Sequence, residues 1–398
     1  MKCLRWLAVF SLIAPAVWAE DPQDDWQLSE VCPPGFVLEG ESCKFSSLYS
    51  EYPSLQDAGM GGLKVGLPEP RDGFKPAEID LGRLLFFDPV LSGDGSVSCA
   101  SCHQPDKGFT DGRALSRGIH GQIAERSAPS LWNVGFLDTL FWDGRAKSLE
   151  EQMLGPLYAE HEMGNTPEQL MASLSANPTY VKLFKQAFPE RGLTLDTVYI
   201  ALAAFESSLI SLNSRYDLYA HGFHDVLNQN EIEGMNIFRS FVARCGECHT
   251  PPLFTNRELA VLGTPEPTGR PLDIGAEGPT GDRSLRGGFK VPTLRNIELT
   301  APYMHSGRFK TLRETVEFYT KGRGHAVPEG EHLSIHWHIW EPKLTDAELD
   351  RLVDFLLTLT DQSFMPVIPE RVPSGLSVVD ALNHSEITTT PVAMGDTP

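Results

Sequence analysis

The pattern Cys-x-x-Cys-His occurs twice in this chain and constrains its structure more than any other feature. Each copy has two cysteines about one helical turn apart and a histidine directly after them: Cys99, Cys102 and His103, then Cys245, Cys248 and His249. Two thiols at this spacing can add to the two vinyl groups of one haem, and the histidine can ligate the iron. A zinc site or a reducible disulfide is the alternative for such cysteines. Two complete copies favour two covalently bound haem c groups.

The first 19 residues have the pattern of a secretory signal peptide. Lys2 and Arg5 precede an apolar run over residues 6–17, and Val17 and Ala19 place small residues where signal peptidase cleaves. A retained membrane anchor is the alternative, but the run is shorter than the roughly 20 apolar residues that a span needs. No later segment is apolar enough to cross a bilayer. We therefore expect a periplasmic protein, cleaved after Ala19, without a membrane span.

Cys32 and Cys43 are the cysteines that remain, because Cys3 leaves with the signal peptide and four others bind haem. In an exported protein, two leftover thiols most simply form a disulfide. This disulfide would staple an irregular N-terminal arm over residues 20–75, where neither a helical nor a strand period is sustained. It is also consistent with the periplasm.

The formal net charge of −20 argues against a nucleic-acid partner, because nothing in the chain supplies the basic surface that phosphate binding needs. Loss of Lys2 and Arg5 with the signal peptide would make the mature chain more negative still. An acidic surface could attract a basic protein donor, although most of these charges need have no role beyond solvation.

The regular elements that the sequence predicts are helices. Pro76 opens the first, whose apolar residues recur at helical spacing, and Thr166 and Thr345 are N-cap residues followed three positions later by Gln or Glu. The chain has 35 Gly and 30 Pro, which suit long loops around cofactors, and we expect residues 366–398 to be a disordered tail. The predicted fold is mainly α, with helices at 76–87, 148–154, from 166, 178–187, 195–216, 230–245, 312–319 and 344–359.

Between about residues 76 and 360 the chain carries a series of ordered motifs: LGRLLFFD at 81–88, FWDGRA at 141–146, GP at 155–156, EM at 162–163, VPTLRN at 291–296 and TAPYMH at 300–305. With these motifs the chain resembles the bacterial di-haem cytochrome c peroxidases and their relative MauG, which matures tryptophan tryptophylquinone. The resemblance implies two all-α cytochrome c-like domains, expected here at 76–220 for the peroxidatic haem and 221–365 for the electron-transfer haem. It also implies an enzyme that acts on hydrogen peroxide.

The same resemblance assigns roles at the first haem, where His103 would be the proximal ligand and the opposite face would be open. Trp142 would lie between the two haems, although a buried tryptophan packs at a domain interface in any case. Glu162, assisted by Gln152, would move the proton that cleavage of the peroxide bond requires. A solvated charge is the alternative for Glu162, and Glu151 and Glu160 are neighbours with which these residues could be confused.

Tyr319 occupies the position at which the peroxidases have a methionine ligand to the second haem and MauG has a tyrosine. A phenolate stabilises oxidised iron, whereas a thioether favours the ferrous form. Tyr319 therefore favours a MauG-like second haem, which shares a high-valent state with the first. Met304 is the nearest alternative ligand, and packing in the core is the alternative role for Tyr319.

Three further positions bear on the branch of the family. The switch histidine of the peroxidases aligns with Ile119, so the first haem is expected to stay open unless a one-residue slip lets His120 ligate it. The surface tryptophan of MauG aligns with Ala243. A group of histidines and tryptophans precedes the last predicted helix: His332, His336, Trp337, His338 and Trp340. These residues could carry oxidising equivalents to the surface or bind copper or zinc, or have no metal at all.

The family also holds a calcium ion between its domains. Its two carbonyl ligands fall on Thr300 and Pro302, but its asparagine ligand falls on Ser127, and serine is a weaker oxygen ligand than an amide. One calcium ion is therefore expected with less support than the haems.

Taken together, the residues and the resemblance predict an exported di-haem enzyme that reacts with peroxide and oxidises an aromatic residue of a partner protein. One alternative is a cytochrome c peroxidase that takes electrons from a small cytochrome c or a cupredoxin. The other is a di-haem electron carrier without chemistry of its own.

Overall fold

The computed structural model describes residues 26–47, 49, 66–321, 326–378 and 382. The predicted signal peptide and its cleavage site lie outside these residues. Within the described part of the chain, no helix is both long and apolar enough to cross a membrane.

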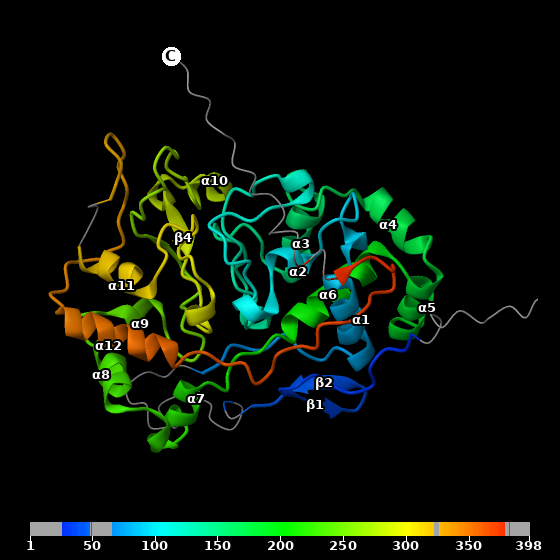
Figure 1. The fold of residues 1–398 in the computed structure, drawn as a ribbon, viewed down its shortest axis with the longest axis horizontal. Helices are drawn as coiled ribbons and strands as arrows, with labels where there is room; N and C mark the ends of the chain where they lie inside the picture. The colour runs from blue at the N-terminus through cyan, green and yellow to red at the C-terminus, as the bar shows by residue number, and fades with distance from the viewer. Residues whose placement is uncertain (1–25, 48, 50–65, 322–325, 379–381, 383–398) are drawn as a thin grey trace, which may run out of the picture.

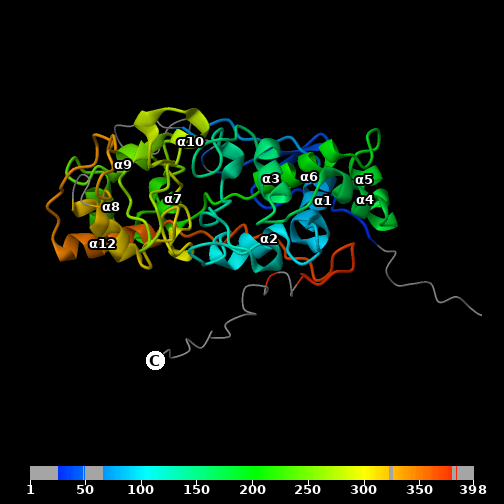
Figure 2. The same ribbon diagram turned by 90° about the horizontal axis from the view of Figure 1, so that it is seen from above.

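The helices form two units that lie end to end in an elongated molecule (Figures 1 and 2). Buried apolar residues gather in two main clusters, one in each unit. The first unit holds α1 (Pro76–Phe87), α2 (Cys99–Cys102), α3 (Leu149–Tyr158), α4 (Pro167–Ser175), α5 (Pro178–Ala187) and α6 (Leu195–Ser207). The second holds α7 (Arg215–Ala220), α8 (Gln229–Phe238), α9 (Cys245–Cys248), α10 (Glu277–Thr280), α11 (Leu312–Thr320) and α12 (Asp346–Leu357). This mainly helical architecture confirms the predicted fold class.

Short 3-10 turns and strands punctuate the loops between the helices. Two antiparallel pairs of short strands occur, β1 (Phe36–Glu39) with β2 (Ser42–Phe45) and β3 (Leu259–Val261) with β4 (Gly288–Lys290). The turns are η3 (Pro89–Leu91), η4 (Pro105–Lys107), η5 (Ile119–Gly121), η6 (Val134–Phe136), η7 (His224–Val226), η8 (Arg283–Leu285) and η9 (Ile297–Leu299).

Each unit is built on the same crossing of two helices, α1 with α6 and α8 with α12. A Cβ added to Gly82 of α1 would lie 1.8 Å from the Ala201 carbonyl oxygen, and one added to Gly234 of α8 would lie 1.9 Å from the Arg351 carbonyl oxygen. Only glycine lets the backbones approach so closely. The repeated contact indicates that the two units are variants of one domain.

Aromatic pairs repeat at the same places next to these crossings. The ring centroids of Phe86 and Phe205 are 5.0 Å apart with planes at 59°, and those of Phe238 and Phe355 are 5.1 Å apart with planes at 58°. In each pair the first ring follows its glycine by four residues, one helical turn. The hydrophobic core is therefore duplicated together with the helices.

Helix starts follow the capping chemistry in the sequence. Thr166 Oγ1 accepts from the Gln169 backbone N–H at 3.2 Å, and Thr345 Oγ1 accepts from the Glu348 N–H at 3.3 Å. These bonds satisfy N–H groups that a helix start leaves without an intrahelical partner. Both predicted caps are confirmed.

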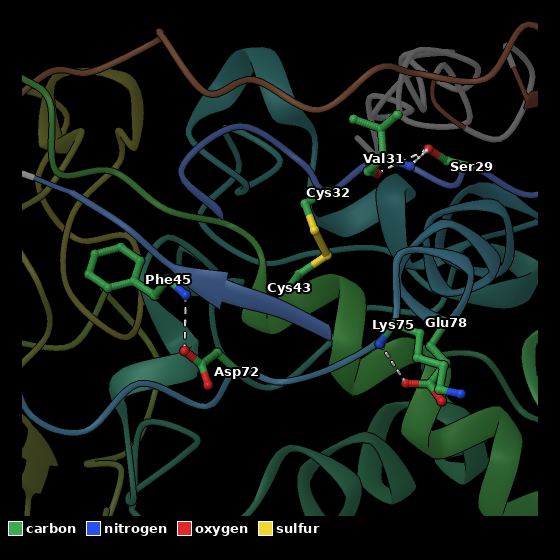
Figure 3. Close-up of a disulfide and its surroundings, with 8 residues drawn as sticks. All are labelled: Ser29, Val31, Cys32, Cys43, Phe45, Asp72, Lys75 and Glu78. Atoms are coloured by element: carbon green, nitrogen blue, oxygen red, sulfur yellow. Dashed lines mark hydrogen bonds between the residues drawn. A yellow bond between two sulfur atoms is a disulfide. The ribbon is translucent and has the colours of Figure 1, made fainter. Parts of the chain in front are cut away.

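The N-terminal arm lies along the first unit and contains more structure than expected. Cys32 and Cys43 form a disulfide beside the β1–β2 hairpin (Figure 3). The Phe45 N–H donates to Asp72 Oδ2 at 3.0 Å, and the Cys43 N–H donates to the Phe74 carbonyl oxygen at 2.8 Å. The arm is thus tied to the chain just before α1, and the expectation of a wholly irregular arm is wrong over residues 36–45.

The helix predicted at 195–216 ends at Ser207, because tertiary hydrogen bonds take over the following backbone. Asn133 Nδ2 donates to the Ser211 carbonyl oxygen at 3.0 Å, and the Ser211 N–H donates to Asn133 Oδ1 at 2.9 Å. Tyr216 and Ala220 of α7 then pack in the core of the second unit. The boundary at residues 220 and 221 stays a prediction, and α7, which it assigns to the first domain, packs with the second unit.

The helix predicted at 230–245 likewise ends early, at Phe238, and Arg244 has a left-handed backbone with φ of 56° immediately before α9. The second motif thus occupies a short helix of its own.

The segment 366–378, expected as part of a disordered tail, packs back on the first unit. Val372 and Val378 are buried in its core, and Ser374 Oγ donates to Asp88 Oδ1 at 2.6 Å. Local sequence gives no signal of this return, because the contacts join residues far apart in the chain.

Candidate haem sites

The first motif lies on α2, a single helical turn that starts at Cys99. His103 follows this turn, and its Nδ1 is 2.9 Å from the Phe109 carbonyl oxygen. Burial lowers the pKa of His103, so the ring is neutral. A neutral imidazole that donates from Nδ1 keeps its lone pair on Nε2, which is the nitrogen available to a metal.

A cavity of about 280 Å³ adjoins this motif. Its lining includes Cys99, Cys102 and His103, and it brings in Trp142, Gln152 and Glu162 from the loop before α3, from α3 and from the loop after α3. The residues predicted to serve the first haem thus share one cavity.

Glu162 and Arg145 line the same cavity as Gln152. Burial raises the pKa of Glu162 above its ordinary value, and His161 and Arg145 partly offset the rise. The side chain keeps 35% of its surface accessible, which is consistent with its place in the cavity wall. A carboxyl group with a raised pKa is suited to exchange protons near neutral pH.

The two neighbouring carboxylates take no part in this cavity. Glu151 accepts from the Lys147 backbone N–H at 2.7 Å at the start of α3, and Glu160 is exposed. Among the acidic residues that the sequence left as alternatives, Glu162 is the one in the cavity wall.

Trp142 joins the two units. Its Nε1 donates to the Ser127 carbonyl oxygen at 2.9 Å, and its own carbonyl oxygen accepts from the Lys290 N–H at 2.7 Å. Lys290 belongs to β4 of the second unit, whereas Ser127 belongs to the first. Trp142 is therefore held at the interface through its indole by the first unit and through its backbone by the second.

Arg126 strengthens the same interface. Its Nε and Nη2 donate to the two carboxylate oxygens of Asp273 at 2.7 and 2.9 Å, and its Nη1 donates to Asp143 at 2.7 Å. Burial alone would raise the pKa of Asp273, but the hydrogen bonds from Arg126 and Gly275 and the charge of Arg126 together outweigh burial, and the pKa is lowered. A bidentate pair of this kind fixes the relative orientation of its partners.

Lys290 and Glu206 are two cavity residues that the sequence analysis missed. Burial lowers the pKa of Lys290 to about 8, and burial raises that of Glu206 to about 8. Glu206 Oε2 is buried and has no hydrogen-bond partner among the described residues. Buried charged or polar groups need a partner, and the two propionates of a haem are anions that could pair with both, with Glu206 as a neutral acid.

His120 lies outside the cavity wall. It follows Ile119, which is buried in the core, and its side chain is 66% exposed with Nδ1 3.5 Å from Asp94 Oδ2. The sequence left open whether His120 reaches the first haem, and in this structure it points to the surface.

The second motif, on α9, repeats the arrangement of the first. His249 Nδ1 is 3.1 Å from the carbonyl oxygens of both Phe254 and Pro292, and burial lowers its pKa to about 4. The ring is therefore neutral, again with Nε2 available to a metal.

Tyr319 comes from the last turn of α11 to the second motif. The sulfur atoms of Cys245 and Cys248 lie close enough to raise the pKa of its phenol, beyond the larger effect of burial. Met304 lies in a different loop, where its backbone carbonyl oxygen accepts a hydrogen bond from Ser127 Oγ at 3.0 Å. Of these two sequence candidates, Tyr319 is the one seen to adjoin the second motif.

His305, in the TAPYMH segment, has a structural role that the sequence did not reveal. Its Nε2 is 2.6 Å from Glu266 Oε1, and its ring stacks on Phe289 at a centroid distance of 3.8 Å. Both members of this ion pair are buried. The pair holds the loop that carries Thr300 and Pro302 against the unit interface.

The calcium candidates come partly together. Ser127 Oγ donates to the Met304 carbonyl oxygen at 3.0 Å, and the Ser127 N–H donates to the His305 carbonyl oxygen at 2.8 Å. Thr300 lies near Gly108 of the first unit. Both sides of the interface thus meet near the predicted ligands, and calcium itself stays a prediction.

A loop before α12 places the remaining aromatic and histidine residues against the second motif. Trp337 and Trp340 are largely exposed, and both lie near the guanidinium of Arg244, the residue before Cys245. His338 Nε2 is 2.8 Å from Glu247 Oε2. His332 is exposed at the start of this loop.

The residues present fit covalent haem at both places. Each site offers two half-buried cysteines on one helical turn and a neutral histidine with Nε2 available. The first cavity also offers Lys290 in its wall and Glu206, whose Oε2 is buried without a hydrogen-bond partner among the described residues.

Comparison with known proteins gives consistent matches. Residues 76–225 match the family model described as di-haem cytochrome c peroxidase. A cytochrome c551 peroxidase of Nitrosomonas europaea is 37% identical over 299 residues, which cover 73% of this chain and 83% of that protein. The methylamine utilization protein MauG of Methylorubrum extorquens is 32% identical over 306 residues, covering 76% and 84%. The solved structure of a MauG-like protein associated with microbial copper homeostasis superposes with a TM-score of 0.70 at 32% identity, covering 76% and 97%.

Proposed function

Since the chain belongs to the di-haem cytochrome c peroxidase and MauG family and is an oxidoreductase that acts on peroxide, we propose that it passes oxidising equivalents to an aromatic side chain of a partner protein. Haem c is the cofactor of this family. The observation that carries the proposal is the place of Tyr319, half-buried near Cys245 and Cys248 of the second motif. A tyrosine ligand there favours oxidised iron over ferrous iron.

The chemistry that bound haem supplies is an iron centre that peroxide can oxidise by two equivalents. Glu162, in the wall of the first cavity, takes a proton from the inner oxygen of the peroxide and returns it to the outer oxygen. Gln152 orients the peroxide from α3. The raised pKa of Glu162 lies closer to the pH at which the enzyme works, so the carboxyl group can both take up and release a proton.

Access of peroxide to the first site follows from the position of His120. This side chain is directed to solvent and paired with Asp94, so it leaves the side of the cavity opposite His103 open. A prior reduction of the second haem is then not required for peroxide to bind.

Trp142 couples the two sites. The hydrogen bond to Ser127 anchors its indole and the bond from Lys290 anchors its backbone, so that the ring needs little reorganisation when charge passes through it. Haem bound at the two sites would supply the oxidising equivalents, and Trp142 would relay them.

A cytochrome c peroxidase that takes electrons from a small cytochrome c or a cupredoxin is the second candidate. Ala243 stands where MauG has its surface tryptophan, and the 37% identity to the Nitrosomonas europaea peroxidase favours this candidate as well. It requires that the second haem be reduced before peroxide reacts.

The test is the electronic and EPR spectrum of the fully ferric protein, before and after one equivalent of peroxide. We expect a high-spin haem and a low-spin haem with His and Tyr ligands, and a long-lived species oxidised by two equivalents. Tyr319→Phe should change the spectrum of the second haem, with Tyr303→Phe as a control on the loop at the interface. Reaction only after one-electron reduction, or an unchanged spectrum in Tyr319→Phe, would favour the detoxifying peroxidase.

Two smaller proposals complete the function. The periplasm is the compartment in which the Cys32–Cys43 disulfide is stable and in which such a protein partner would be met. One calcium ion would bind between the units through Ser127, Thr300 and Pro302, and its removal by a chelator should loosen the interface that holds Trp142.

A further inference from the structure

Three potential ligand atoms converge at the edge of the second haem site, two of them from histidines that the proposed function does not use. The sulfur of Cys248 and one ring nitrogen each of His336 and His338 all lie within 4.8 Å of one another. Cys248 Sγ is 3.9 Å from His338 Nδ1. All three side chains are half-buried, and two of them come from the loop before α12.

The hydrogen bonds of His338 determine which of its nitrogens carries the lone pair. Nε2 is 2.8 Å from Glu247 Oε2, and a carboxylate accepts a hydrogen from this nitrogen. Nδ1 is then the bare nitrogen, and it is the one that faces the Cys248 sulfur. A histidine oriented by a carboxylate in this way is typical of metal sites.

Attachment of haem removes the thiol hydrogen between Cys248 and His338. A free thiol could donate its hydrogen to Nδ1, but the thioether formed with haem has no hydrogen to donate. Two lone pairs would then face each other across 3.9 Å. With metal–sulfur and metal–nitrogen distances of about 2.3 and 2.0 Å, a trigonal ion would hold these atoms about 3.7 Å apart.

We propose that His336, His338 and the Cys248 sulfur bind one cuprous ion beside the second haem. Two imidazoles and a thioether are neutral and include a soft donor, a set that selects Cu(I) over harder divalent ions. Arg244 lies 3.9 Å from the carboxylate of Glu247, so these two charges offset each other beside the site and the donor set decides which ion is preferred.

The backbone keeps the two histidines in place. The His336 N–H donates to the Val261 carbonyl oxygen of β3 at 2.8 Å, and the His338 N–H lies 3.4 Å from His336 Nδ1. Trp340 Nε1 donates to the Val242 carbonyl oxygen at 3.0 Å, which ties the end of the loop to the segment before α9. The ligands are thus held on two fixed segments. The proposal is independent of the reaction at the first haem.

The experiment is anaerobic equilibrium dialysis of the purified di-haem protein against Cu(I) buffered by bathocuproine disulfonate, with copper measured by mass spectrometry. We expect one Cu(I) per chain. The double variant His336→Ala/His338→Ala should lose this binding, whereas His332→Ala, on the same loop but outside the cluster, should retain it. Glu247→Ala should weaken binding by about 10- to 100-fold, the usual effect of losing a residue that orients a ligand.

X-ray absorption at the copper edge of the wild-type protein keeps the proposal testable even if the double variant fails to mature. We expect one sulfur at about 2.3 Å and two nitrogens at about 2.0 Å. A shell without sulfur, an equal loss of copper in His332→Ala, unchanged binding in the double variant, or displacement of the copper by equimolar Zn²⁺ would each overturn the assignment.

Discussion

The backbone N–H of Lys290 donates to the carbonyl oxygen of Trp142 at 2.7 Å, and so joins a strand of the second unit to the residue between the two candidate haem sites. The side chain of Lys290 also lines the cavity of the first site. One residue of the second unit thus contributes both to the anchoring of Trp142 and to the charge around the first haem.

Trp142→Phe should slow charge transfer between the sites while leaving both haems attached. Phenylalanine is harder to oxidise than tryptophan, and it lacks the Nε1–H that donates to Ser127, a bond worth about 1 kcal/mol. After peroxide is added to the ferric protein, we expect the spectral change at the first haem to persist and the change at the second to be delayed. Trp26→Phe, in the N-terminal arm, is the matched control, and equal transfer rates in both variants would contradict the role of Trp142.

Lys290→Met should lower the reduction potential of the first haem, because a positive charge near the iron favours its reduced form. Burial lowers the pKa of this lysine to about 8, so in the absence of a partner anion the effect should fade as the pH rises through 8. A propionate partner would raise the pKa of Lys290, so its effect on the reduction potential would persist to higher pH. Spectroelectrochemical titration measures the potential, Lys290→Arg should restore much of it, and Lys147→Met at the surface should leave it unchanged.

Glu162→Gln should reduce the rate of reaction with peroxide by roughly 10²- to 10⁴-fold, the usual contribution of a general acid–base group. The carboxylate must be unprotonated to accept the proton from peroxide, and burial raises its pKa above the ordinary value. The rate in the wild-type protein should therefore fall as the pH drops through this raised pKa. Stopped-flow measurement over a pH series tests both points.

Glu160→Gln is the matched control for this prediction, since Glu160 is exposed and two residues away. A similar loss in both variants would indicate a general effect of charge and not catalysis by Glu162.

The sequence predicted elements whose determinants are local and missed those that depend on distant contacts. α1 and α5 have the predicted bounds, because proline starts each helix and their apolar residues follow a helical period. α6 was predicted too long, because Asn133, almost 80 residues before Ser211, supplies the competing hydrogen bonds. The return of residues 366–378 to the first unit depends on equally distant partners.

The candidate site shows the same division. The cysteine and histidine motifs are local, and the resemblance supplied Trp142, Glu162 and Tyr319. Lys290 and Glu206 could not be recognised as cavity residues, because nothing in their local sequence marks them as buried. Lys290 directly precedes the VPTLRN motif, which was the one available signal. His338 stood out by composition, but only the structure places it beside Cys248.

Gly82→Ala and Gly234→Ala should each destabilise the protein, because each glycine lies at the crossing of two helices that repeat between the units. The added Cβ would overlap the Ala201 or Arg351 carbonyl oxygen, and neither backbone can move without separating its helix pair. Overpacking of a core usually costs about 1–3 kcal/mol, and overlap with backbone places these variants at the upper end. Denaturant unfolding of the di-haem protein measures the loss. Gly278→Ala, where the nearest atom would be 3.6 Å away, should be nearly neutral.

Because the two crossings are equivalent, substitution of Gly82 should broaden the spectrum of the first haem, and substitution of Gly234 that of the second. An identical disturbance of both haems by either variant would argue that the units unfold as one.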